Sequence, residues 1–296
     1  MPNLHQLEKK IDTATGLQSI VKTMKSMAAV NIHQYEQAAS SLDSYLETIE
    51  TGLSAVIGET EFLWKQGRPQ GRERLLVVFG SDQGLCGRFN KKLVEFLQYE
   101  KKEILPRNEI SLLVTGARIK NRLESEGYNI IQGFWSPGSV EGINRHILKI
   151  VLEISSWRER QAENRIDLLF NYHNQSGSTA EPLHLPLFPL GPRKLRELTE
   201  RPWPSRCLPW FAEKADNLAS YLIRQFLFVA IFRAQAQSLA SEQASRLQSL
   251  QQAEKNIREH LEELQSDYRQ LRQSVITGEL LDLVSGFKSA AGKSHT

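Results

Sequence analysis

Proline is almost absent from the two ends of this 296-residue chain. One proline stands at position 2, and the other ten of the 11 lie between residues 69 and 209. Because a proline inside a helix costs about 3 kcal/mol, arms without it can form continuous helices. The proline distribution therefore favours one long helix at each end of the chain, separated by a middle segment of a different fold.

Apolar residues in both arms recur at alternating spacings of three and four, the pattern of a coiled-coil seam. Fourteen of sixteen such positions from Leu4 to Val56 are apolar, and nine of twelve from Ala240 to Gly278. The exceptions are Gln18 and Lys25 in the first arm and Gln243, Glu254 and Gly278 in the second. The pattern then shifts by one residue, to Ile276, Leu280, Leu283 and Phe287. Such a shift is typical of a coiled-coil stutter.

Helices over residues 3–57 and about 211–288 would be roughly 80 Å and 115 Å long, too long for a compact globule. We expect them to pack on each other as an antiparallel coiled coil, since the middle segment joins the end of one to the start of the other. Polar seam residues such as Lys25, Gln243 and Glu254 either set the register with their heads exposed or contribute to a surface for a third protein.

The middle segment alternates predicted strands with predicted helices, which favours a small, mainly parallel sheet with helices on its faces. The expected strands are 74–79, 110–115 and 165–171, and the expected helices are 89–102, 117–125 and 140–160. Residues 177–209, rich in Pro and Gly, would form an irregular or hairpin connection. The predicted fold class is α/β with long helices: a two-helix antiparallel coiled coil plus a Rossmann-like domain. The predicted divisions are 1–58, 59–208 and 209–296.

Composition excludes several classes of function. With 37 Lys and Arg against 34 Asp and Glu, the net charge of +3 is too small to predict nucleic-acid binding. The two cysteines lie 121 residues apart, and the seven histidines show no metal-ligand spacing, so we expect no metal site and no cofactor. No apolar run reaches the roughly 20 residues of a membrane helix. The N-terminus resembles neither a signal nor a transit peptide, so we expect a prokaryotic protein on the cytoplasmic side.

The segment from Gly80 to Asn90 follows a predicted strand and opens a predicted helix, where backbone amides can hold a phosphate. It matches neither GxGxxG nor a P-loop, so a tight turn permitted by glycine is the favoured interpretation, with a partner-docking loop as the alternative. Cys86 could be a reactive thiol at a helix start, but no histidine lies nearby and Asp82 disfavours a thiolate, so a packed side chain is favoured. No local signature predicts catalytic residues.

Four segments, in the same order along the chain, resemble the gamma subunit of F-type ATP synthases. The segments are Ile20–Ala29 (IVKTMKSMAA), Ser81–Asn90 (SDQGLCGRFN), Ala240–Arg246 (ASEQASR) and Arg272–Leu280 (RQSVITGEL) with Val284–Gly286 (VSG). The resemblance implies a central rotor shaft that transmits torque between ion flow through the membrane c-ring and the catalytic ring, without catalysis of its own. Its implied partners are the alpha, beta and epsilon subunits and the c-ring.

Motif by motif, the resemblance also implies roles for individual residues. Arg272 and Gln273 would catch a loop of the beta subunit. The region that couples the two helices to beta would contain Met24, Lys25, Arg246, Thr277 and Glu279. The lower contact loop would contain Ser81, Asp82, Gly84 and Cys86.

The chain departs from the family pattern after Arg246. The family usually continues with small residues, whereas this chain has Glu254 in place of Thr and Ile257 in place of a small residue. These departures suggest a second, variant F-type ATPase that works mainly as an ATP-driven H⁺ or Na⁺ pump. Two alternatives remain open: a generic coiled-coil scaffold or tether, and a small nucleotide-binding α/β enzyme.

Overall fold

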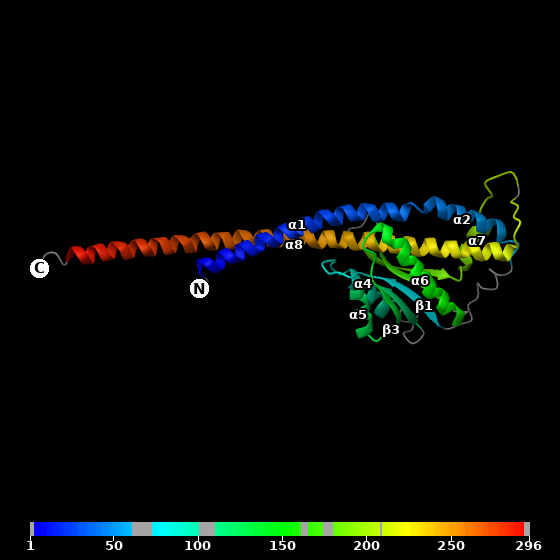
Figure 1. Cartoon of the computed structure of the whole chain (residues 1–296), viewed down its shortest axis with the longest axis horizontal. Coiled ribbons are helices and arrows are strands. Elements are labelled where there is room, and N and C mark those ends of the chain that lie inside the picture. The colour runs from blue at the N-terminus through cyan, green and yellow to red at the C-terminus, as the bar shows by residue number, and fades with distance from the viewer. Residues whose placement is uncertain are drawn as a thin grey trace. The chain divides into compact units, whose positions relative to one another are not determined.

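The computed structural model describes residues 3–60, 73–100, 110–160, 165–173, 180–207 and 209–292. Its elements are ordered helix, helix, strand and then an alternation of helices and strands that ends in one very long helix (Figure 1). None of the described helices is both long enough and apolar enough to cross a bilayer.

Three helices form the two arms: α1 (Leu4–Ser40), α2 (Asp43–Val56) and the 78-residue α8 (Ala215–Gly292). The prediction of one continuous helix over residues 3–57 is wrong in one respect, because the helix is interrupted at Ser41 and Leu42. Neither proline nor glycine stands at this break. The hydroxyl of Ser41 instead donates to the carbonyl oxygen of Ala38 at 2.8 Å, a local bond that competes with helix continuation.

The predicted seam is confirmed almost position by position. All sixteen seam positions from Leu4 to Val56 are buried or half-buried, including the two polar exceptions. In α8 the same holds for every predicted position from Ala240 to Gly278 except Val275, which is 39% exposed. The period of the apolar pattern thus identified which side of each helix is covered, as far as Gly278. The predicted continuation after the one-residue shift is wrong for its described side chains, because Ile276, Leu280 and Leu283 are 49%, 58% and 64% exposed.

Contacts group the chain into two compact units. One, the two-helix unit, consists of Met1–Met27 and Ser249–Thr296, and the other, the α/β unit, consists of Ala28–Gln248. Within the two-helix unit, residues near the start of α1 lie beside residues near 260, and Lys25 contacts Glu254, so the two segments run antiparallel. The predicted division at 1–58, 59–208 and 209–296 stays a prediction.

The α/β unit is built on a five-stranded sheet with the order β3-β2-β1-β4-β5. The strands are β1 (Arg74–Phe79), β2 (Ile110–Thr115), β3 (Asn129–Phe134), β4 (Arg165–Tyr172) and β5 (Glu181–Phe188). Strands β1 to β4 pair with one another in parallel, and β5 pairs antiparallel with β4. The expected mainly parallel sheet is confirmed, and the segment after residue 177 contains the hairpin partner of β4.

Alternate residues of the central strand β1 support two separate cores. Leu75, Val77 and Phe79 pack on the face covered by α6 (Val140–Arg160) and α8. Leu76 and Val78 pack on the opposite face, against α4 (Phe89–Glu95) and α5 (Ala117–Ser125). Because β1 is buried on both faces, its sequence RLLVVF is a continuous apolar run rather than an alternating one.

Three elements of this unit were not predicted as such. Strand β5 lies in the segment that was predicted to be an irregular or hairpin connection. Strand β3 lies at the sheet edge, half-exposed, with Gly133 in its sequence. Helix α7 (Pro192–Thr199) follows β5 in a region predicted to be irregular. The helix predicted over 89–102 begins correctly at Phe89 but changes to a π-helical turn, η1 (Phe96–Glu100), and residues 101 and 102 lie outside the described part.

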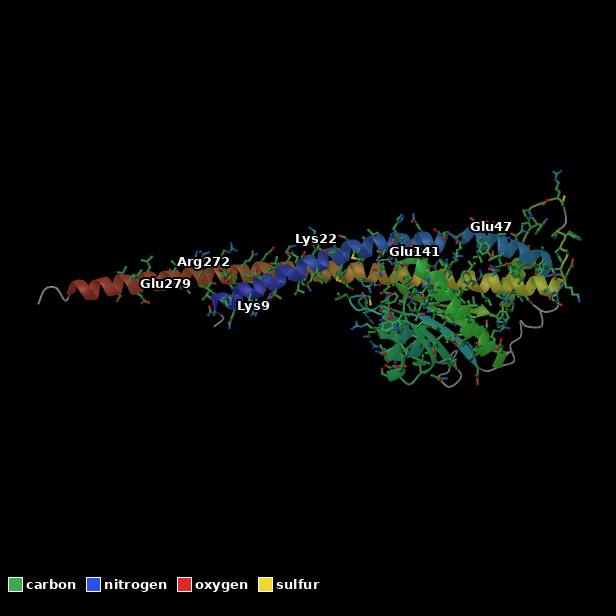
Figure 2. All side chains as sticks on the ribbon, in the orientation of Figure 1. Lys9, Lys22, Glu47, Glu141, Arg272 and Glu279 are labelled. Carbon is green, nitrogen blue, oxygen red and sulfur yellow. The ribbon has the colours of Figure 1, made fainter. Side chains whose placement is uncertain are left out.

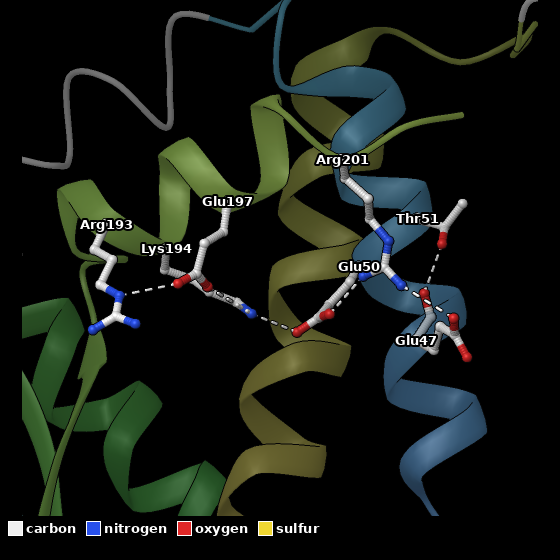
Figure 3. Close-up of polar contacts among 7 residues, drawn as sticks. All are labelled: Glu47, Glu50, Thr51, Arg193, Lys194, Glu197 and Arg201. Atoms are coloured by element: carbon white, nitrogen blue, oxygen red, sulfur yellow. Dashed lines mark hydrogen bonds and ion pairs between the residues drawn. The ribbon is translucent and has the colours of Figure 1, made fainter. Parts of the chain in front are cut away.

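Helix α7 is held against α2 by a network of ion pairs centred on Glu50 (Figure 3). The Glu50 carboxylate accepts from Lys194 Nζ and from an Arg201 guanidinium nitrogen, each at 2.7 Å. Arg201 also pairs with Glu47 at 3.3 Å. The Glu50 side chain is only 17% exposed, and its partners Lys194 and Arg201 lie in and just after α7. The network therefore attaches α7 and the residues that follow it to α2.

Candidate partner-contact sites

The two charged seam exceptions face each other in the two-helix unit. Lys25 Nζ lies 2.5 Å from a carboxylate oxygen of Glu254. This bond, more than any other influence, lowers the pKa of Glu254, and Arg258 and Lys22 lower it further. The departure from the family pattern at Glu254 is therefore matched by a charge on the other helix, and both charges are satisfied within the chain.

Arg272 is an exposed residue of α8 in the same unit (Figure 2). The next residue, Gln273, is exposed as well. In an antiparallel pair, Arg272, eighteen residues beyond Glu254, lies near Leu7, eighteen residues before Lys25. Helix α1 begins only three residues before Leu7. Arg272 therefore lies in the last part of α8 that has α1 beside it.

Beyond Arg272, α8 exposes both polar and apolar side chains. Thr277 and Glu279 are exposed. Among the described residues, no lysine, arginine or histidine forms an ion pair with Glu279. Six large apolar side chains between 39% and 64% exposed share this stretch: Val275, Ile276, Leu280, Leu281, Leu283 and Val284. An apolar helix surface of this extent is typical of a segment that another protein encloses.

Arg246 belongs to the α/β unit, and it is buried rather than exposed. Its guanidinium lies 2.5 Å from the carboxylate of Glu242, one helical turn earlier, and both side chains are less than 9% exposed. Burial raises the pKa of Glu242, and Arg246 opposes that shift. Burial, with a further contribution from Glu242, likewise raises the pKa of Tyr35 on α1. Arg246 is therefore committed to an internal pair.

The loop after β1 is held in place by its own polar side chains. The Asp82 carboxylate accepts from the backbone N–H groups of Ala117 and Ser136, each at 2.8 Å, and so caps the start of α5. Asn90 Oδ1 accepts from the backbone N–H of Ser81 at 3.0 Å. These bonds tie the loop to the ends of two neighbouring strands.

Cys86 is 4% exposed and packs in a small cluster with Phe89 and Ala180, so its interpretation as a packed side chain is confirmed. Asn171, at the end of β4, donates to the carbonyl oxygen of Phe89 at 2.9 Å. In doubly wound folds a nucleotide lies outside the carboxyl ends of the strands where the strand order reverses. In this sheet the strand order reverses between β1 and β4. The Asn171 side chain fills the space at the carboxyl ends of these two strands with its bond to Phe89, which argues against the nucleotide-binding alternative.

A buried polar layer joins α8 to the same end of the sheet. Ser238 donates to the carbonyl oxygen of Phe79 at 3.1 Å. His146 Nε2 lies 3.1 Å from Thr115 Oγ1. Burial, followed by the charge of Lys149, lowers the pKa of His146 to about 4, so the imidazole is neutral at pH 7. The layer therefore connects α6 and α8 to the sheet through buried polar contacts.

Two of the predicted groupings can be compared with the structure. Ser81, Asp82 and Cys86 lie together in one loop, and Lys25 of the predicted coupling region lies between the two helices, against Glu254. Sequence reasoning missed Glu242 as the partner of Arg246. The spacing of four residues between opposite charges on a helix could have identified that pair.

Comparison with known proteins identifies the family of this chain. A family model described as ATP synthase matches residues 3–290. The chain therefore belongs to this ATP synthase family, and its relatives are gamma chains.

Among these relatives, the ATP synthase gamma chain of Amoebophilus asiaticus is 27% identical, over 97% of this chain and 98% of that protein. The gamma chain of Pelagibacter ubique is 26% identical, over 98% and 100%. A chain of the Euglena gracilis mitochondrial ATP synthase (OSCP/F1/c-ring) superposes with a TM-score of 0.68 at 16% identity, over 99% of this chain and 96% of that one. A chain from the central stalk and c-ring of the Tetrahymena thermophila mitochondrial enzyme gives 0.57 at 18% identity, over 79% and 99%.

Proposed function

We propose that this chain is the central rotor stalk of an F-type ATPase and transmits torque between a membrane c-ring and a catalytic ring of alpha and beta subunits. The observation that carries the proposal is the covered seam along both terminal helices, in a chain that the family model matches from residue 3 to residue 290. A stiff shaft whose contacts differ among three surrounding sites can shift the populations of their states, since only differential interaction energy does so.

In this role the chain performs no bond chemistry, and the nucleotide sites belong to its partners. The epsilon subunit and the c-ring would bind the α/β unit, and the complex would lie at the cytoplasmic face of a prokaryotic membrane. The departures after Arg246 support the proposal that the enzyme pumps H⁺ or Na⁺ at the expense of ATP. The Na⁺ version would be contradicted by a neighbouring c-subunit gene that encodes an ordinary proton site beside a synthesis-competent operon.

Co-purification tests the stalk function directly. Affinity capture of the full-length chain from its native host should retain alpha and beta subunits at a ratio of three to one to the chain. A lone soluble homodimer would contradict the proposal and favour the scaffold alternative.

Within this function we propose that Arg272 and Gln273 catch a loop of beta, and that Met24, Lys25, Thr277 and Glu279 belong to the coupling region. Arg246 would act there indirectly, by holding Glu242. Changing both Arg272 and Gln273 to Ala should lower coupled ATP hydrolysis in the assembled enzyme about five-fold, the equivalent of one lost polar contact of about 1 kcal/mol. The melting temperature of the isolated chain should not change.

The matched control for this pair is Lys255→Ala with Glu259→Ala, an exposed ion pair on the same helix within the two-helix unit. The control should leave hydrolysis unchanged. Equal turnover and pumping in the Arg272 and Gln273 variant and in the wild type would remove these two residues from the proposed contact.

A further inference from the structure

A cavity of about 330 Å³ lies beside the break between α1 and α2, within the α/β unit. Helix α1 ends at Ser40 and α2 begins at Asp43, and both of these residues line the cavity. Residues of α8 and of the end of β4 form the rest of its wall. The cavity therefore brings together segments that are distant in the sequence, at the point where the N-terminal helix is interrupted.

Small side chains leave this space open. Ala39 on α1 and Ala240 on α8 both line the cavity, and both are buried at positions of the predicted seam. On α8, Arg233 and Gln237 precede Ala240 at spacings of four and three residues, so all three lie on one side of the helix. Since a water molecule takes up about 30 Å³ of liquid, the cavity has room for a ligand of about ten non-hydrogen atoms.

Several polar side chains that line the cavity have no partner within the described part of the chain. Glu36 is exposed on α1 and forms no ion pair or hydrogen bond there. Two buried nitrogen atoms, Arg233 Nε and His173 Nδ1, have no hydrogen-bond partner in the same part of the chain. An unpaired buried polar group costs free energy and is rare in native proteins, so these two atoms indicate a partner that the chain does not supply.

The charges around the cavity are of both signs. One terminal guanidinium nitrogen of Arg233 pairs with the carboxylate of Asp43 at 3.1 Å. Because a guanidinium carries five N–H donors, Arg233 keeps donors for a second acceptor. The carboxylate of Glu36 has no such cation. The cavity therefore offers unused donors from Arg233 and His173 and an unused carboxylate from Glu36.

This combination favours one class of ligand over three others. Among the described residues, no group of three His, Cys, Asp or Glu side chains could hold a metal ion. A simple anion such as inorganic phosphate would be repelled by the carboxylates of Glu36 and Asp43, and a simple amine would be repelled by Arg233. A zwitterion satisfies both sides, because each of its charges forms a charge-assisted hydrogen bond with an opposite group.

We propose that this cavity binds a small zwitterion of the α-amino acid class, whose ammonium group is held by Glu36 and whose carboxylate is held by Arg233 and His173. The bound molecule connects α1 to α8 beside the break and so stabilises the helical arm at its interruption. The inference is independent of the proposed rotor function, because the whole site belongs to this chain.

Equilibrium dialysis of the full-length chain with radiolabelled L-glutamine, a zwitterion of ten non-hydrogen atoms, tests the proposal. A ligand of this size held by a few polar contacts should bind with a Kd of about 1 mM. Glu36→Gln and Arg233→Gln should each weaken binding by about ten-fold or more, since each removes one charge-assisted contact. Inorganic phosphate and methylamine should compete with the labelled ligand about ten-fold less well than unlabelled L-glutamine.

Glu36→Gln separates binding from folding, because Glu36 has no partner in the described part of the chain and its loss should leave the melting temperature unchanged. The matched control is Glu8→Gln, which removes an exposed carboxylate of the same helix outside the cavity and should not change binding. L-Glutamine should also slow amide hydrogen exchange in residues 38–46 of the wild type, but not of Glu36→Gln.

Three outcomes would overturn the inference. The first is the absence of saturable L-glutamine binding by the wild type. The second is wild-type affinity in both Glu36→Gln and Arg233→Gln. The third is tighter binding of inorganic phosphate than of L-glutamine, which would assign the cavity to anions.

Discussion

The two units of this chain bury apolar surface in different ways. In the α/β unit, the residues of β1 from Leu75 to Phe79 are completely buried. Their side chains contribute to one core on each face of the sheet. In the two-helix unit, the buried apolar residues of the described part are Leu7, Ala14, Leu250, Leu261 and Leu264. More large apolar residues are exposed there than are buried.

This difference indicates what each unit requires for stability. A sheet covered on both faces excludes water with its own helices, whereas two helices can cover only one stripe of each other. The α/β unit is thus expected to be stable by itself. The two-helix unit presents the surface that a surrounding protein would cover.

The largest effect is expected from the centre of the sheet. Phe79→Ala should lower the free energy of unfolding of the α/β unit by about 3–5 kcal/mol, because it leaves a cavity beneath α8. Urea unfolding followed by circular dichroism measures the change. A loss below about 1 kcal/mol would show that the two-faced core is not the main source of stability.

The polar layer at the end of the sheet should make stability depend on pH. His146 has a pKa of about 4 in the folded chain against 6.5 when unfolded, so the unfolded state binds more protons between these values. Stability is then fully present above about pH 6.5 and is lost as the pH falls towards 4, by up to about 3 kcal/mol. Lys149 opposes protonation of His146, and Asp82 favours it.

His146→Gln removes the titrating group while it keeps a side chain that can bond Thr115. The difference in free energy of unfolding between pH 7 and pH 4.5 should therefore be smaller in this variant than in the wild type. An identical pH dependence in both proteins would assign the acid sensitivity to other groups.

A smaller loss is expected from the seam of the two-helix unit. Leu264→Ala should destabilise it by about 2 kcal/mol, at the low end for a buried leucine, because solvent lies beside a two-helix seam. Hydrogen exchange of amides in residues 4–27 should accelerate, and exchange in β1 should stay unchanged. Faster exchange in β1 would contradict the separation into two units.

The smallest effect is expected from the ion pair between Lys25 and Glu254. A double-mutant cycle with alanine should give a positive coupling that disappears at high salt, whereas the more exposed control pair Lys255 and Glu259 should give none. Because Lys25 lowers the pKa of Glu254, the contribution of the pair is present above the ordinary carboxylate pKa. It is lost as the pH falls through the lowered value.

Sequence patterns predicted the elements that follow one uniform pattern, either the coiled-coil period of a helix or the unbroken apolar run of a strand buried on both faces. The seam of α1 and the buried strands β1, β2 and β4 are of this kind. Strand β5 was not recognised because Pro182 and Pro186 interrupt its sequence, and proline is tolerated there only because β5 lies at the sheet edge. The break at Ser41 carries no proline or glycine, so the proline argument could not detect it.

The sequence by itself determined that the ends are long helices, which side of each is covered, and that a parallel sheet lies between them. The proline distribution, the coiled-coil period and the unbroken apolar runs suffice for this because they depend only on neighbours along the chain. Only the tertiary structure decided that Lys25 meets Glu254, that Arg246 is buried against Glu242, and that Leu85 faces solvent. These outcomes depend on register, burial and backbone φ, which arise only when distant segments pack together.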